Sequence, residues 1–374
     1  MHIREFGVER WLYLYENACE LNLAETCVES FTLGELLKLA GKEETFLGEI
    51  LPMKLTYGVI DGTERLRGAI ASLHENQRIE NVLITHGAIS ANALLYETLV
   101  EPGDHVISVA PTYQQHHSIP ESLGAKVEVL RLREQNAFLP DFDELRAMVT
   151  PSTRAIVINN PNNPTGSLME REFLGEIAQI ARSCGAYVLS DEVYRGSDQQ
   201  GDGFTASIAD LYEKGVSTGS MSKTWSLAGL RLGWIVAPVE VLRRVQIHRD
   251  YNTISVGMLN DWLASIALEN RSAILQRNHD ILRTNLALLD AWIAHEPCLS
   301  YVKPKSGTTA WLRIGLDMTS DEFCVSLLEK TGVLLVPGAV LDGEGYVRIG
   351  YANNRAVLAA SLARMSDFLR AIPR

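Results

Sequence analysis

The sequence lacks a surplus of positive charge, paired cysteines and long apolar runs. Its 34 Lys and Arg against 46 Asp and Glu give a net charge of −12, which disfavours nucleic acid or an anionic membrane as partner. Five cysteines without Cys-x-x-Cys spacing argue against a disulfide framework or a zinc site and favour a reducing, cytoplasmic compartment. No apolar run reaches the roughly 18 residues that cross a bilayer, and the first residues resemble no secretory signal. We therefore expect no metal, no nucleic acid and no membrane partner.

What is present is an alternation of short β-branched or apolar runs with amphipathic stretches between residues 82 and 249. This alternation predicts an α/β fold with a largely parallel sheet and helices on both faces. Ligands of such sheets bind beyond the carboxyl ends of the strands, so the loops after each run are the candidate site. The runs cover residues 82–85, 105–110, 126–132, 154–159, 186–190 and 232–237, and the clearest helices cover 89–100, 167–183 and 238–249.

The chain of 374 residues is long enough for two domains. We expect residues 1–45 to form an N-terminal arm or lid that contributes to a small domain, with helices at 8–20 and 32–41. Residues 46–255 would form the large cofactor-binding domain, and residues 256–374 a smaller α+β domain that begins with two helices. A capping box at Thr319–Glu322 predicts a helix start in the small domain.

Lys223 lies in a stretch of small hydroxyl residues, 217–222, and is followed eight residues later by Arg231. An amine suits Schiff-base formation with an aldehyde, and hydroxyls with a guanidinium suit a phosphate on the same molecule. Taken alone, the stretch is more often an ordinary surface loop. The hydroxyl residues are Ser217, Thr218, Ser220 and Ser222.

Gly87 follows the run that ends at Thr85, and it leads into a helix. A glycine there permits close approach of a ligand, and the amides of Ala88 and Ile89 would form an anion site at the helix start. The run that ends at Ala110 is followed by Tyr113, which either stacks on a planar ring or packs under a loop.

The two remaining strand ends carry polar groups. Asn163, in the rigid loop 160–166, either donates to a phenolate oxygen or belongs to a tight strand–helix connection. Asp191 either holds a protonated pyridine nitrogen or caps a helix, and Tyr194 would bond the ring oxygen from the same side. Arg348, from the C-terminal part, either grips a substrate carboxylate or is a surface arginine on a strand edge.

In this order the motifs resemble the class I/II aminotransferase family of fold type I pyridoxal-phosphate enzymes. The resemblance covers roughly residues 50–360. It is carried by Tyr57-Gly58 with Gly62, Gly87-Ala88, Pro111-x-Tyr113, Asn160-Pro-Asn-Asn-Pro-Thr-Gly166, Asp191-Glu-Val-Tyr194, Ser220-x-Ser-Lys223, Gly229-Leu-Arg231-x-Gly233 and Val347-Arg348.

The resemblance implies pyridoxal 5'-phosphate as cofactor and a reaction through a lysine aldimine and a quinonoid. Lys223 would form the aldimine and move the proton, Asp191 would hold the pyridine nitrogen, and Arg348 would bind the substrate carboxylate with Asn163 nearby. It also implies a homodimer with shared sites, in which Tyr57 reaches the phosphate of the neighbouring subunit. The other implied cofactor contacts are Gly87, Ala88, Ile89, Tyr113, Asn163, Tyr194, Ser220, Ser222 and Arg231.

The N-terminal stretch departs from the usual family pattern. Residues 21–35 lack the glycine-rich Gly-x-Pro-like segment of many members and look more like a branch that acts on arginine-type substrates. That branch includes capreomycidine synthases and oxygen-using arginine oxidases and hydroxylases. We therefore look to the acidic N-terminal segment, with Glu16, Glu20 and Glu25, for recognition of the substrate side chain.

Three functions follow as hypotheses. The first is an enzyme that acts at the α-amino group of an L-amino acid, by default an aminotransferase. The second is an arginine oxidase, hydroxylase or capreomycidine-type cyclase within the same fold. The third is a cofactor-binding sensor, which the sequence disfavours because no basic DNA-binding module accompanies the fold.

Overall fold

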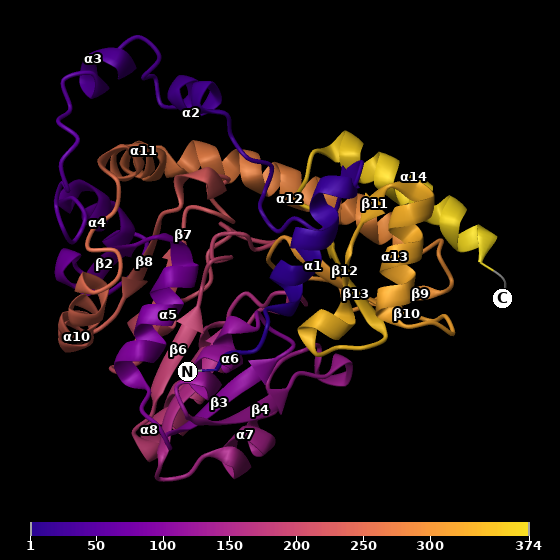
Figure 1. Ribbon diagram of the computed structural model, residues 1–374, viewed down its shortest axis with the longest axis horizontal. Helices are drawn as coiled ribbons and strands as arrows, with labels where there is room; N and C mark the ends of the chain where they lie inside the picture. Colours follow the sequence, from indigo (N-terminus) through magenta and orange to yellow (C-terminus); the bar gives the residue numbers. More distant parts are fainter. Residues whose placement is uncertain (1, 373–374) are drawn as a thin grey trace.

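A computed structural model describes residues 2–372 and contains a large sheet and a small lobe (Figure 1). The large sheet has the strand order β2-β8-β7-β6-β5-β3-β4. Neighbouring strands are parallel except for β8, which runs antiparallel to both β2 and β7. The strands are β2 (Val82–Thr85), β3 (His105–Ala110), β4 (Lys126–Arg131), β5 (Thr153–Asn159), β6 (Tyr187–Asp191), β7 (Gly215–Ser220) and β8 (Gly233–Val236).

Helices cover both faces of this sheet, as the alternating pattern predicted. In β5, Ile156 and Ile158 point to the face covered by α8, whereas Ala155 and Val157 point to the face covered by α5 and α10. Consecutive strand side chains alternate between faces, so both faces of a covered sheet carry apolar residues. The helices of this part are α4 (Glu64–Ala71), α5 (Gly87–Leu99), α6 (Gln115–Ser122), α7 (Phe142–Met148), α8 (Arg171–Cys184), α9 (Ile208–Leu211) and α10 (Val239–Asp250).

Strand β7 is the main element that the sequence analysis missed, because the stretch that begins at residue 217 was interpreted as a loop. Its sequence, Gly-Val-Ser-Thr-Gly-Ser, has few of the residues that favour strands. It is nevertheless buried along its whole length between β6 and β8. Gly219 is required there, because a methyl carbon would lie 2.5 Å from the ring of Trp234.

The small lobe is built on a four-stranded antiparallel sheet of order β12-β13-β10-β9. Its strands are β9 (Leu299–Tyr301), β10 (Thr309–Ile314), β12 (Val336–Pro337) and β13 (Tyr346–Gly350). Helix α13 (Ser320–Thr331) packs against β12 and β13, and α14 (Arg355–Ala371) packs against α13. Thr319 and Glu322 form the predicted capping box of α13. Helices α11 (Met258–Glu269) and α12 (Arg271–Ile293) run from the large sheet to this lobe (Figure 1).

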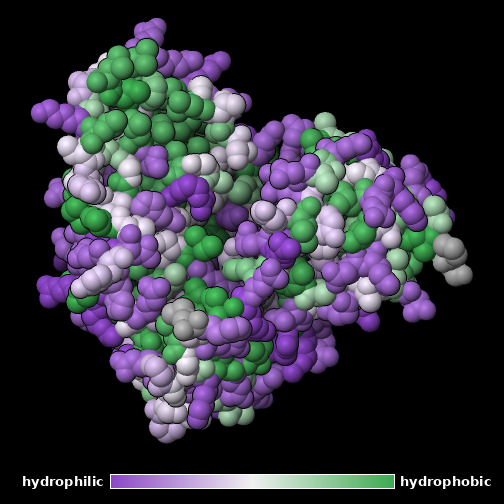
Figure 2. Space-filling view, in the orientation of Figure 1, coloured by the Kyte–Doolittle hydropathy of each residue, from purple (hydrophilic) through white to green (hydrophobic). Residues whose placement is uncertain are grey.

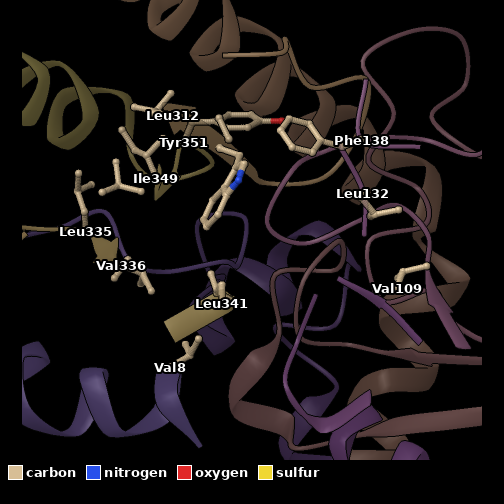
Figure 3. Close-up of a cluster of buried hydrophobic side chains, with 14 of the residues drawn as sticks. Val8, Val109, Leu132, Phe138, Leu312, Leu335, Val336, Leu341, Ile349 and Tyr351 are labelled. Atoms are coloured by element: carbon tan, nitrogen blue, oxygen red, sulfur yellow. The ribbon is translucent and has the colours of Figure 1, made fainter. Parts of the chain in front are cut away.

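The N-terminal segment belongs to the small lobe in space. Strand β1 (Leu21–Asn22) pairs in parallel with β11 (Val333–Leu334), and Val8 of α1 (Gly7–Tyr15) lies near Leu341 in the apolar cluster of Figure 3. Helix α1 is shorter than the helix predicted at 8–20, because it ends at Tyr15 and is followed by a 3-10 turn at 16–18. The chain then passes through α2 (Leu33–Leu39) and α3 (Phe46–Ile50) to α4. The domain boundaries at 45 and 255 stay predictions.

Candidate active site

Most of the predicted residues meet in one cavity of about 390 Å³ between the sheet edge, the small lobe and the N-terminal segment. Lys223, Asp191 and Tyr194 all line it: Asp191 ends β6, Tyr194 follows that strand, and Lys223 follows β7. The predicted residues that share this lining are Glu16, Glu25, Ala88, Ile89, Tyr113, Asn163, Asp191, Tyr194, Ser220, Ser222, Lys223, Arg231 and Arg348. Strand ends and the segments that follow them thus supply one side of the cavity wall, as expected for this class of sheet, and the N-terminal segment supplies another.

Some predicted residues lie elsewhere. Glu20 does not line the cavity and instead pairs with Arg364 at 2.7 Å. Tyr57 is exposed on the outer surface of its own chain, where Ser255 donates a hydrogen bond to its carbonyl oxygen. Ser217 and Thr218, the first two of the hydroxyl residues, also point away from the cavity. Ser217 donates to Glu192 and Thr218 to Asn92, each at 2.8 Å.

The floor of the cavity holds Asp191 at the end of β6. Its carboxylate accepts hydrogen bonds from Asn92 Nδ2 at 2.9 Å and from the amide of Val193 at 3.1 Å, and it lies 3.3 Å from His116 Nε2. His116 Nδ1 in turn lies 2.8 Å from the hydroxyl oxygen of Tyr96. These hydrogen bonds fix the direction in which the carboxylate points.

One end of the cavity is an anion cradle. Helix α5 begins at Gly87 without a side-chain cap, so its first amides remain available as donors to a ligand. Gly233 brings β8 against this helix start, because a methyl carbon there would lie 2.4 Å from the carbonyl carbon of Gly87. Arg231, in a left-handed backbone conformation with φ 47°, places its guanidinium beside Gly87. The hydroxyls of Ser220 and Ser222 complete the lining of this end.

Two further polar groups are buried and lack a protein partner. They are the hydroxyl of Tyr194 and Nε of Arg348, each on a side chain only 2% exposed. A buried donor without a partner is costly, so these atoms call for a polar ligand. Burial lowers the pKa of Arg348, partly offset by Tyr194 and Tyr113. Together with the anion cradle, the donor set fits a phosphorylated, hydroxyl-bearing aromatic aldehyde next to a substrate carboxylate.

The mouth of the cavity is acidic. Glu9, Glu16 and Glu25 line it from the N-terminal segment, and Tyr113 donates a 2.5 Å hydrogen bond to Glu9. Burial raises the pKa of Glu25, and Glu16 raises it further, while Lys223 lowers it. Because Glu16 and Glu25 carry like charges, a cation placed between these two carboxylates would be stabilised.

Sequence reasoning missed several residues that line the cavity. Glu9 stands in the first turn of α1, where an acidic residue is ordinary and carries no separate indication of function. Asn92 lies on a mainly apolar helix, and a polar residue among buried apolar neighbours was a usable indication. The other missed polar residues in the lining are Thr26, Cys27, Gln115 and Asn159.

Comparison with known proteins agrees with this geometry. Residues 49–364 match the family model described as aminotransferase class I and II. Among curated proteins, the chain is 30% identical to the capreomycidine synthase of Streptomyces vinaceus, over 97% of this chain and 93% of that protein.

Two solved structures are similar over nearly their whole length. One is a PLP-dependent aminotransferase from Streptococcus suis 89-1591, with TM-score 0.97 and 43% identity over all of both chains. The other is the PLP-dependent cyclase OrfR, with TM-score 0.91 and 27% identity over 99% of this chain and 98% of that one. The chain therefore belongs to the class I and II aminotransferase family, and its cofactor is pyridoxal 5'-phosphate.

Proposed function

We propose that the protein acts at the α-amino group of an L-amino acid, by default as an aminotransferase. The observation that carries this proposal is the position of Lys223. Its amine shares one cavity with a carboxylate at a strand end, an anion cradle and a buried arginine. These are the groups that a phosphorylated aldehyde cofactor and an amino-acid carboxylate require. The 43% identity to a PLP-dependent aminotransferase supports the same reaction class.

The residues of the cavity divide into three tasks. Bound pyridoxal 5'-phosphate supplies an aldehyde for the amino group and a protonated ring that accepts the electron pair left at the α-carbon. Asp191, whose carboxylate is oriented by hydrogen bonds from Asn92 and Val193, would hold the proton on the ring nitrogen. Tyr194 and Asn163 would donate to the ring oxygen, and Tyr113 would hold the ring. Ala88, Ile89, Ser220, Ser222 and Arg231 hold the phosphate, with Gly87 leaving room for it.

Lys223 then serves as the base at the α-carbon. Its amine lies in the same cavity as Asp191 and Arg348, which would hold the cofactor ring and the substrate carboxylate. A base held next to a reacting carbon contributes several kcal/mol to the lowering of a barrier. Arg348 fixes the substrate by its carboxylate and so decides which bond at the α-carbon faces Lys223.

The acidic mouth supports a substrate with a cationic side chain. Glu9, Glu16 and Glu25 are the carboxylates on the side of the cavity that faces the N-terminal segment. A guanidinium or ammonium group would neutralise their mutual repulsion. Glu20, which we expected to belong to this set, lies outside the cavity and is paired with Arg364.

A second candidate function rests on the same acidic mouth and on the relatives. Capreomycidine synthase and the cyclase OrfR are similar along almost the whole chain. This similarity, with three carboxylates at the mouth, supports an arginine oxidase, hydroxylase or capreomycidine-type cyclase as the alternative. An oxygen-using reaction would consume dioxygen with L-arginine and would need no keto-acid acceptor.

We also propose that the protein works as a homodimer. Apolar side chains stand exposed around α3 and around the turn after α10, and Figure 2 shows an apolar patch at the upper left, over α3. A patch of this kind is typical of a protein interface. Tyr57 stands within this set and would complete the phosphate site of the partner. The exposed apolar residues are Leu47, Leu51, Leu55, Tyr57, Val59, Ile60, Ile247, Tyr251, Ile254 and Leu259.

The deciding experiment is a panel of L-amino acids, each with and without a keto acid, followed by cofactor absorbance and oxygen consumption. We expect conversion of a basic amino acid that depends on the keto acid. Oxygen uptake without a keto acid would select the second candidate. The variant Lys223→Ala should lose both turnover and the absorbance of covalently held cofactor, whereas Lys214→Ala, on a surface turn, should keep both. A Lys223→Ala protein that remained active would contradict the proposal.

A further inference from the structure

The hydroxyl of Thr26 meets the amine of Lys223 from the N-terminal side of the cavity. Lys223 Nζ donates a short hydrogen bond to Thr26 Oγ1 and lies 3.9 Å from Cys27 Sγ. The two partners are 197 residues apart in the sequence, so tertiary structure alone brings them together. Thr26 is 9% exposed, and water therefore cannot easily replace its hydroxyl as acceptor.

Thr26 is held in place by both parts of the molecule. Thr308 Oγ1 donates to the carbonyl oxygen of Thr26 at 2.7 Å, and the amide of Val28 donates to the carbonyl oxygen of Lys223 at 3.3 Å. At position 350, a methyl carbon would lie 1.9 Å from the carbonyl oxygen of Glu25, so Gly350 lets β13 lie directly against this segment. A β-branched side chain on such a fixed backbone has few rotamers. The hydroxyl is thus held at one position relative to the amine.

The same segment holds the second substrate-facing cation. Arg348 Nη2 donates to the carbonyl oxygen of Ala24 at 3.0 Å, two residues before Thr26. Residues 24–26 thereby fix Arg348 through a main-chain oxygen and Lys223 through a side-chain oxygen. This short segment therefore fixes the position of Arg348, which would bind a substrate carboxylate, relative to Lys223, which would move the α-proton.

We propose that Thr26 is a positioning residue for Lys223, whose hydroxyl accepts from the ammonium form and holds the amine on the N-terminal side of the cavity. This inference rests on the proposed function, because it assigns Thr26 a role toward the lysine of that site. A hydrogen bond to the charged form of a buried group stabilises that form. Removal of the hydroxyl should therefore make the amine easier to deprotonate.

Other groups also face Lys223 and act on its charge. Burial lowers the pKa of Lys223, and so does the charge of Arg348. The acidic groups Cys27, Tyr194 and Glu9 raise this pKa, and the net result is a pKa above the ordinary value of a lysine. Glu25 lies close enough for Lys223 to lower the pKa of that carboxyl. None of these groups is changed by a substitution of Thr26, so its effect can be measured separately.

The test uses cofactor-free protein and the pH dependence of cofactor capture. Wild type, Thr26→Val and Thr26→Ser are mixed with pyridoxal 5'-phosphate between pH 6 and 10, and the rate is followed by absorbance. Borohydride reduction and peptide mass spectrometry then identify the labelled lysine. Only the neutral amine captures an aldehyde, so the rising limb of the profile reports deprotonation. We expect the rising limb to lie about one pH unit lower in Thr26→Val, because the loss of a hydrogen bond to a charged group has about that effect. In Thr26→Ser, which keeps the hydroxyl, the rising limb should not move.

The outcomes separate this inference from the proposed function. If wild type is not labelled at Lys223, the proposed function fails. If wild type is labelled there but the Thr26→Val profile coincides with it, the role of Thr26 is overturned and the function stands. Should Thr26→Val not fold, as judged by circular dichroism, Thr26→Ala removes the same hydroxyl without the β-branch. It is then expected to show the same displacement, and its coincidence with wild type would equally overturn the role.

Discussion

Gly87 leaves open the space that the guanidinium of Arg231 uses. A methyl carbon at position 87 would lie 3.1 Å from Arg231 Nη2, and the backbone there has φ 73°, which L side chains rarely adopt. The anion cradle requires glycine at this position for two reasons: glycine adopts the left-handed backbone conformation, and it leaves room for the guanidinium. Arg231 itself has a left-handed backbone, so both residues of the pair are conformationally unusual.

We therefore expect Gly87→Ala to weaken the binding of pyridoxal 5'-phosphate about tenfold. The left-handed conformation costs an alanine roughly 1–2 kcal/mol, and the guanidinium must move away from the cradle. Titration of cofactor-free protein, followed by absorbance, measures the dissociation constant. Gly229→Ala is the matched control in the neighbouring turn, because a methyl group there has no heavy atom within 4 Å. Equal dissociation constants for the two variants would contradict the argument.

The success and failure of the sequence analysis have physical causes. The limits of β2 and β3 were predicted as the structure has them, because their apolar, β-branched residues satisfy both local preference and burial. In β7, by contrast, the small residues are selected by tertiary packing. Gly219 makes room for Trp234, and Ser217 and Thr218 bond Glu192 and Asn92. Strand propensities of single residues do not include these tertiary contacts, so they could not predict β7.

The candidate site shows the same division. Residues at strand ends or in the loops that follow, such as Asp191 and Lys223, could be placed from the sequence because the topology brings strand ends together. Glu20 and Glu25 could not be told apart, since both lie in one acidic segment. Their directions depend on the pairing of β1 with β11 and on the salt bridge between Glu20 and Arg364.

That difference between Glu25 and Glu20 gives a prediction for substrate recognition. We expect Glu25→Gln to raise the KM for a basic L-amino acid by about 10- to 100-fold, because one charge-assisted hydrogen bond is lost. The KM for a neutral amino acid should change little. Glu20→Gln is the control with the same chemical change outside the cavity. Steady-state kinetics with both substrates measures these KM values. Equal effects of the two variants would show that the acidic mouth does not recognise the charge of the substrate side chain.

Asp198 provides a prediction for the pH dependence of stability. Burial raises its pKa to about 7, with Asp202 and Glu170 adding to the rise, while a hydrogen bond from Ser306 and the charge of Arg195 lower it. The folded state thus keeps a proton that the unfolded chain releases near pH 4. The stability from this proton is present below about pH 4 and is lost as pH rises through 7.

In Asp198→Asn this loss should be absent. Relative to wild type, we expect the variant to gain about 2–4 kcal/mol of unfolding free energy between pH 4 and pH 8. Denaturant unfolding at pH 4, 6 and 8 measures the difference. Parallel stability curves for the two proteins over this range would mean that Asp198 is already ionised in the folded state.

The apolar face gives the last prediction, which concerns the homodimer. Leu55 is 82% exposed in the single chain, and Leu55→Glu places a charge at the proposed interface. Because burial of an unpaired charge is strongly unfavourable, we expect sedimentation to show monomers at concentrations where wild type is dimeric. Tyr13→Glu is the control, since Tyr13 is 78% exposed on α1, outside this face.

The monomeric variant should also bind pyridoxal 5'-phosphate more weakly, because it loses the hydroxyl contact of Tyr57 from the partner. Tyr57→Phe loses the same contact in an intact dimer and should weaken binding in the same way. A dimer that survives Leu55→Glu would remove this face as the interface and, with it, the role of Tyr57 in the partner's site.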